Sequence, residues 1–121
     1  MLLMLAPAVA EAENLAGVQK LICAPVTAAD CPFGEACNPV TPRDIGVPSF
    51  VRIDLEKKQL IGPERISPIR VLENADDQLL LGGSELGFAW SMAIDFESGD
   101  MSSTVTDRDG AFVLHGACTA L

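Results

Sequence analysis

The sequence predicts a small all-β domain: an antiparallel meander of about seven short strands, stapled by disulfides and closed into a small barrel or a strongly curled sheet. Three observations predict it. Large apolar residues alternate with small or polar ones near the C-terminus, turn-forming residues recur at short intervals, and four cysteines are spaced as in an exported domain. With 121 residues and 49% hydrophobic composition, the chain suits a single domain with a modest core.

The clearest element is a strand over residues 86–96. A helix would scatter its large side chains around the axis, whereas a strand puts them all on one face. Ser98-Gly99 predicts a two-residue hairpin turn after it, because glycine tolerates the positive φ of tight turns. That turn pairs Ile94 with Ser103, so that the large faces of both strands coincide. The large residues are Leu86, Phe88, Trp90, Met92, Ile94 and Phe96.

Two further strands complete a three-stranded meander. The chain is expected to return over residues 101–106 and to reverse again at Asp107-Arg108-Asp109-Gly110, where glycine suits a left-handed position. The last strand is expected over residues 111–118. One face of that strand carries Phe112, Leu114, Gly116 and Cys118.

The N-terminal residues 1–10, MLLMLAPAVA, form a short apolar run that ends in small residues. Ala8-Val9-Ala10 and Ala10-Glu11-Ala12 both fit the pattern of a signal-peptidase site, so we interpret residues 1–12 as the remnant of a signal peptide without its positively charged start. A buried N-terminal helix is the alternative. The run is too short to span a bilayer, and we expect residues 13–121 to form one periplasmic or secreted domain without stable membrane insertion.

Cys23, Cys31, Cys37 and Cys118 predict two disulfides, for which three connectivities exist. We favour Cys31 with Cys37, closing the CPFGEAC loop, and Cys23 with Cys118, tying the first element to the last. Loop entropy assigns about 4 to 5 kcal/mol to the long bridge and about 2 kcal/mol to the short one. Zinc and redox sites use closer cysteine pairs, so we expect no metal and no other cofactor.

The middle of the chain is punctuated by prolines. A first strand is expected over residues 18–24, and five prolines in residues 25–48 predict a long stapled loop that no helix or central strand traverses. Residues 48–55 alternate as a strand, with Val51, Ile53 and Leu55 on one face. Short strands then follow at residues 60–61, 67–73 and 78–81, and the chain turns at residues 56–59, 62–63, 74–77 and 82–83.

The charge balance limits the partners. The net charge is −9, from 17 acidic and 8 basic residues. Such a chain is a poor partner for nucleic acid or for an anionic membrane surface. Basic proteins remain candidate partners, and the acidity also serves to keep an exported domain soluble.

The segments PSFVRIDLEKKQL, ERISPI and LLLGGSELGFAWSMAIDFESGDMSSTVTDRDGAFVLHGAC resemble a group of small exported bacterial proteins of unknown function. That group shares a W-S-x-x-I-D strand, a turn with glycine and a terminal strand ending in G-x-C. The resemblance covers residues 23–118 and implies no activity.

The chain is also loosely similar, in size, export and β-rich pattern, to periplasmic lysozyme inhibitors of the membrane-bound C-type class. That class uses a Ser-Gly-x-x-Tyr loop and a Trp-x-x-Gly segment. This chain has no Tyr, and Trp90 is followed by Ser-Met-Ala-Ile-Asp, so the inhibitory motif is absent.

Single residues offer few chemical roles. His115 is the only histidine and lacks a partner motif, so we expect it to be structural or at the surface. Asp107-x-Asp109-Gly110 echoes the start of a calcium loop, but the chain then enters a strand and a hairpin turn explains the same residues. Trp90 is expected in the core, with a ligand platform as the alternative.

Three arginines offer one further interpretation, an anion site formed by Arg52, Arg65 and Arg70 if their strands are neighbours. The simpler expectation is that each arginine pairs with a nearby carboxylate, such as Asp54 or Glu73.

We therefore predict a non-enzymatic binding or accessory domain for a protein or cell-envelope component. Its contact surface is predicted in the stapled loop, at Glu35, Asn38, Arg43 and Asp44, because rigid loops are cheap to order on binding. The alternative is a proteinaceous inhibitor of a basic hydrolase such as lysozyme. An enzyme would need convergent titratable groups inside the barrel.

Overall fold

The structure is a computed structural model that describes residues 14–121. The predicted signal-peptide remnant, residues 1–12, lies outside the described residues. Within the described range the chain forms ten strands and a 3₁₀ turn, η1 (Arg43–Ile45), which confirms the all-β class. The strands are β1 (Lys20–Pro32), β2 (Asn38–Val40), β3 (Val51–Asp54), β4 (Gln59–Ile61), β5 (Ile66–Pro68), β6 (Val71–Asn74), β7 (Gln78–Glu85), β8 (Phe88–Asp95), β9 (Asp100–Asp107) and β10 (Gly110–Ala120).

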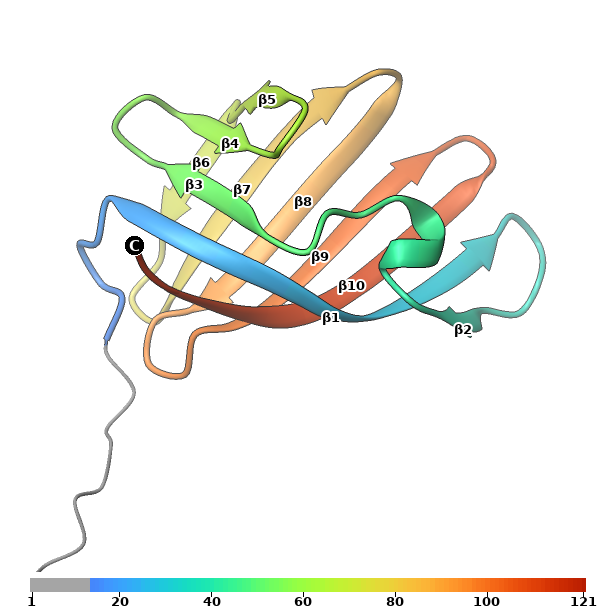
Figure 1. Ribbon diagram of the computed structural model, residues 1–121, viewed down its shortest axis with the longest axis horizontal. Coiled ribbons are helices and arrows are strands. Elements are labelled where there is room, and N and C mark those ends of the chain that lie inside the picture. The colour runs from blue at the N-terminus through green and yellow to red at the C-terminus, as the bar shows by residue number, and fades with distance from the viewer. Residues whose placement is uncertain (1–13) are drawn as a thin grey trace, which may run out of the picture.

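The strands form one antiparallel sheet in the order β5-β4-β3-β1-β10-β9-β8-β7-β6, and β2 pairs with β1. The sheet curls into a half-barrel in which β3, β4 and β5 lie across the ribbons of β7 and β8 (Figure 1). Its two ends, β5 and β6, are separated in the chain only by Ile69 and Arg70. The amide of Ile69 donates to the Lys58 carbonyl at 2.8 Å, and that of Arg70 donates to the Gly82 carbonyl at 2.9 Å. This corner connects both ends of the sheet, and the predicted curling is confirmed.

The core lies inside the curl, between its two sides. Ile94 is fully buried and pairs with Leu79 on one side and Met101 on the other. Across the curl, the indole N–H of Trp90 donates to the Ser67 hydroxyl at 3.1 Å. This hydrogen bond joins β8 to β5, so the tryptophan is a core residue, as predicted.

The predicted turn at Gly82-Gly83 is wrong, because β7 continues through both glycines. Gly83 lies against the tryptophan: a Cβ atom there would come within 2.8 Å of the Trp90 ring and 2.7 Å of the Pro68 carbonyl oxygen. The chain reverses at Leu86-Gly87 instead, where both residues have positive φ. The glycine pair therefore does not form a turn, and Gly83 makes room for a tertiary contact.

This later turn changes one end of the predicted apolar face. Leu86 leaves the strand and is 68% exposed, and Phe88 lies at the margin with 36% exposed. The other four large residues are buried as predicted: Trp90, Met92, Ile94 and Phe96.

The predicted two-residue turn between β8 and β9 is also wrong. β8 ends at Asp95, whose carboxylate accepts the amides of Glu97 at 2.9 Å and Ser98 at 2.8 Å, and these bonds stabilise a longer turn over residues 96–99. Ile94 therefore pairs with Met101 and not with Ser103. A shift of the strand pairing by two residues leaves every side chain on the same face of the sheet, so the predicted core residues are still correct.

The predicted loop over residues 25–48 is wrong in its first part, because β1 runs as a central strand as far as Pro32. Pro25 lies at an irregularity of the pairing with β10, where Val26 is the extra residue. On the other edge of β1, β3 pairs with residues 20–23 and β2 with residues 28–30, so Pro25 falls in the gap between them. The bulge and the gap together let a proline lie within a central strand.

Gly116 allows the two central strands to approach at this bulge. It pairs with Pro25, and a Cβ atom at position 116 would overlap the Ala24 carbonyl oxygen. A second predicted strand is also wrong in its extent. The strand expected over residues 67–73 is broken at the Ile69-Arg70 corner into β5 and β6. This break, together with β2 inside the region predicted as a loop, contributes to the ten strands where about seven were expected.

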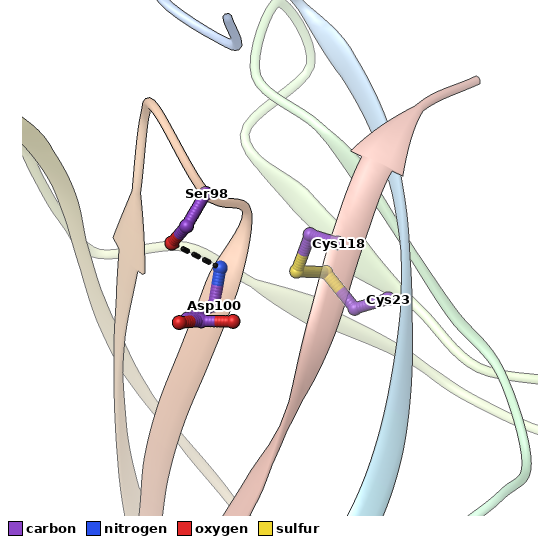
Figure 2. The surroundings of a disulfide bond; sticks show 4 residues. All are labelled: Cys23, Ser98, Asp100 and Cys118. Atoms are coloured by element: carbon purple, nitrogen blue, oxygen red, sulfur yellow. Dashed lines mark hydrogen bonds between the residues drawn. A yellow bond between two sulfur atoms is a disulfide. The ribbon is translucent and has the colours of Figure 1, made fainter. Parts of the chain in front are cut away.

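Both predicted disulfides are confirmed. Cys23 and Cys118 are buried cross-strand neighbours on β1 and β10, whereas Cys31 and Cys37 close the turn between β1 and β2. Figure 2 shows the first bridge beside the β8–β9 turn, in which the Asp100 amide donates to the Ser98 hydroxyl at 3.1 Å. The amide of Cys118 in turn donates to the carbonyl of Gly99 at 2.8 Å, so this turn is fastened to the bridge.

Candidate interaction surface

The four predicted contact residues, Glu35, Asn38, Arg43 and Asp44, are all exposed. They lie along residues 33–50, here called the arm, which connects β1 to β3 and contains β2, η1 and no buried residue. The Asp44 carboxylate accepts the Thr41 amide at 3.4 Å, and the Asn38 side chain donates to the Ala36 carbonyl at 3.4 Å. Two of the four side chains thus shape the arm itself.

The other single-residue candidates fall on the surface. His115 is exposed on β10, between Ser102 of β9 and Thr27 of β1. The Asp109 amide donates to the Asp107 carboxylate at 2.9 Å within the β9–β10 turn, which is the hairpin that the sequence favoured. Among residues 14–121, no group of three or more His, Cys, Asp or Glu side chains is placed to hold a metal ion.

The three arginines lie on different segments, and neither of the two cavities described below has more than one of them in its lining. Arg52 lies on β3, Arg65 before β5 and Arg70 at the β5–β6 corner, and all three are exposed. The expected pairing with Asp54 or Glu73 is wrong, because within the described residues the one ion pair joins Arg108 to Asp109 at 4.0 Å.

Two adjoining cavities open where the arm meets β3, β4 and the turn between β4 and β5. They share Pro48, Gly62 and Pro63 and have volumes of about 610 and 380 Å³. The predicted contact loop therefore contributes to them through its C-terminal end, while its four predicted contact residues line neither cavity. The larger cavity is also lined by Ile22, Ser49, Phe50, Arg52 and Ile61, and the smaller one by Gly46, Leu60, Glu64, Arg65 and Glu85.

Strand pairing arranges the floor of the larger cavity as a row, here called the Arg52 row: Ile22 of β1, Arg52 of β3 and Ile61 of β4. Their chain neighbours Leu21 and Ile53 are buried, so this row points outward, because side chains alternate along a strand. Phe50 lies two residues before Arg52 and is 61% exposed. Large apolar side chains thus surround one guanidinium on the solvent side of the sheet.

The larger cavity differs electrostatically from the rest of this acidic chain. Arg52 lines it and no carboxylate does, whereas the smaller cavity has Glu64 and Glu85 beside Arg65. Asp54, the next outward position on β3, is buried and accepts the Lys57 amide at 3.0 Å. Within residues 14–121 the Arg52 guanidinium makes no ion pair, so it is available to an external anion.

An acidic cavity of about 260 Å³ lies elsewhere, near the start of the described chain. Hydrogen bonds from the Ser98 amide, and secondly from the Glu97 amide, hold the pKa of the Asp95 carboxyl below its usual value. Asp95 is therefore ionised at neutral pH and adds to the negative potential there. The acidic residues that line this cavity are Asp76, Asp77, Asp95 and Glu97.

Sequence reasoning missed the larger cavity, although one signal for it was present. The alternation of β3 places Phe50 on the outward face with Arg52, and a large aromatic residue on a solvent face is a reason to expect a contact surface. The walls contributed by Pro48 and Pro63 come from separate segments, and only the folded chain shows that they meet.

Fold and surface together define a disulfide-stapled, curled β domain with an open, partly apolar groove on the outer face of its sheet. Comparison of the chain with protein families, with curated proteins and with solved structures finds no match. In the part of the chain that the structure describes, no helix is both long and apolar enough to cross a membrane.

Proposed function

We propose that this chain is a non-enzymatic binding or accessory domain that works in the periplasm or outside the cell and contacts a protein partner. Its two disulfides support an oxidising compartment, because such bonds persist in exported proteins and are rare in the cytosol. The contact surface in this proposal is the groove formed by the two adjoining cavities, together with the arm beside it.

The observation that carries the proposal is the outward placement of Phe50 and the Arg52 row. Small monomeric proteins rarely leave large apolar side chains grouped on their surface without a partner. Aromatic residues and arginine are also the types most enriched at the centres of protein interfaces. The groove therefore has the composition of a binding surface.

The interior supports binding at the surface over chemistry inside the barrel. Leu79, Leu81, Met92 and other apolar side chains fill it. Among the described residues the buried polar ones are Ser67 and Ser103 in this interior and Asp54 at an outward position of β3, and each makes a hydrogen bond within the chain. An interior of this composition stabilises the fold and, within residues 14–121, offers no polar group that is free to take part in chemistry.

Site-specific photo-crosslinking in the producing cells tests the proposal. A benzoylphenylalanine placed at Phe50 should give a discrete protein adduct, and one placed at Phe33 tests the arm. The same probe at His115, on another part of the outer face, is the matched control and should give no adduct. If neither Phe50 nor Phe33 yields an adduct, the proposal is wrong.

The acidic cavity favours a second candidate function, inhibition of a basic hydrolase such as lysozyme. Four carboxylates at one site would attract a strongly cationic enzyme. A turbidity assay with lysozyme and bacterial cell walls decides the matter. Micromolar domain should slow the clearing, and this effect should weaken with added salt; unchanged clearing rules this function out.

A further inference from the structure

We infer that the larger cavity recognises an extended apolar peptide segment that carries a carboxylate, with Arg52 as the anchor for the carboxylate. The flanking apolar side chains of the segment would contact Phe50, Ile22 and Ile61. This inference rests on the proposed function, because it names the chemistry of the protein partner that the groove accepts.

Arg52 has apolar neighbours in the sheet. Its cross-strand neighbours, Ile22 and Ile61, are both apolar, and no carboxylate lines the cavity. A guanidinium binds a carboxylate through two parallel hydrogen bonds, and these bonds strengthen when apolar groups exclude water. A carboxylate of the partner could therefore pair with Arg52 without displacing a carboxylate of this chain.

The net charge of −9 does not exclude an acidic segment. At physiological salt, charges are screened over about 8 Å, so distant carboxylates repel the partner only weakly. The local charge at the point of contact decides, and in this cavity it is positive. The same reasoning disfavours a basic segment, which would place a second cation against Arg52.

The shape of the site favours a peptide over an enclosed small molecule. Phe50, Arg52 and Pro63 are exposed, so a ligand would lie across the sheet and remain open to solvent on one side. Small-molecule sites usually enclose most of the ligand surface. The three strands that carry the Arg52 row span about 10 Å, which an extended peptide covers in about three residues.

The probe for this inference is a phage-displayed library of random heptapeptides, panned on the disulfide-bonded domain. Enriched peptides should contain Asp or Glu next to Leu, Ile, Val or Phe. Synthetic peptides of the enriched class should lose about tenfold or more in affinity for Arg52→Glu, and several-fold for Arg52→Gln. Replacing their acidic residue with the matching amide should weaken binding to the native domain by a similar factor.

Two matched controls use exposed residues outside the groove and the arm. Arg108→Glu changes an arginine in the β9–β10 turn, and Val71→Ser changes an apolar residue of β6 that is 59% exposed; neither should alter affinity. Phe50→Ser should weaken binding. The variants at Arg52 and Phe50 and the two controls all change exposed residues, so each should keep the native circular dichroism spectrum. If the charge reversal Arg52→Glu nevertheless unfolds the domain, Arg52→Gln replaces it in the test.

Several results would overturn the inference. They are the absence of enrichment, enrichment of basic or uncharged peptides, and equal affinity for Arg52→Glu and the native domain. Oleate displacing the peptides would assign the groove to a lipid carboxylate, and a dimer dissociated by Phe50→Ser would assign it to a second copy. If a probe at Phe50 still gives a protein crosslink in cells, any of these results leaves the proposed function standing. If neither Phe50 nor Phe33 gives a crosslink, the proposed function itself is wrong.

Discussion

The two disulfides of this domain lie in opposite surroundings. Cys23–Cys118 joins cross-strand neighbours at the centre of the sheet, belongs to the buried core and has a sequence separation of 95. Cys31–Cys37 has a sequence separation of only 6 and lies at the N-terminal end of the arm, in which no residue is buried. One cysteine framework thus serves two purposes. The first bridge stabilises the fold, and the second orders an exposed segment beside a groove.

The largest expected effect comes from removing the core bridge. Replacing both Cys23 and Cys118 with Ala should lower the free energy of unfolding by about 4 to 5 kcal/mol, because the unfolded chain regains the entropy of a long loop. Urea unfolding followed by fluorescence measures this, since the chain has a single tryptophan. A loss below about 1 kcal/mol would show that the two regions do not differ as their burial indicates.

The next effect tests the closure of the curl near the same core. Trp90→Phe removes the donor to the Ser67 hydroxyl, which is only 2% exposed, and leaves it buried without a partner. The expected cost is about 1 to 3 kcal/mol, measured by circular dichroism during urea unfolding. Adding Ser67→Ala removes the orphaned hydroxyl, so the double variant should be less destabilised than the sum of the single variants. Additive costs would contradict a direct bond.

The arm bridge should matter less for global stability. Replacing Cys31 and Cys37 with Ala releases at most about 2 kcal/mol of loop entropy, and the arm has no buried residue through which to transmit the loss. Hydrogen exchange should therefore accelerate at residues 33–50 and stay nearly unchanged at core amides such as that of Ile94. Equal acceleration in both regions would place the arm within the cooperative core.

The parts of the fold that the sequence predicted correctly depend on local patterns. The alternation around Trp90, Met92 and Ile94 identified the buried face of β8, because a strand has a fixed side-chain period. The pairing of Cys23 with Cys118 was predicted as a tie between the first and last elements, and the folded chain places the two cysteines opposite each other on β1 and β10.

The errors arose where a residue serves a distant contact. Gly82-Gly83 has the composition of a turn, yet Gly83 makes room for the Trp90 ring, which comes from the next strand. Pro25 indicates a loop by local rules, yet a bulge opposite Gly116 admits it to a central strand. The groove escaped prediction for the same reason, because Pro48 and Pro63 meet only after folding.

The smallest expected effect is a pH dependence that belongs to the core region and not to the arm. Asp95 shapes the turn that is fastened to Cys118 through Gly99, and the amides of Ser98 and then Glu97 hold its pKa below the usual value. A carboxyl with a lowered folded pKa stabilises the fold above its unfolded pKa, near pH ~3.9, and this stabilisation is lost as the pH falls through the folded pKa.

Stability measured between neutral and acidic pH should therefore fall slightly more in the native domain than in Asp95→Asn, whose amide does not titrate. The effect is small because the carboxylate is exposed. Asp44→Asn is the matched control, since Asp44 accepts a backbone amide within the arm and its replacement should leave the pH dependence of global unfolding unchanged. If Asp44→Asn flattens the curve and Asp95→Asn does not, the arm contributes more to the stability of the fold than its exposure indicates.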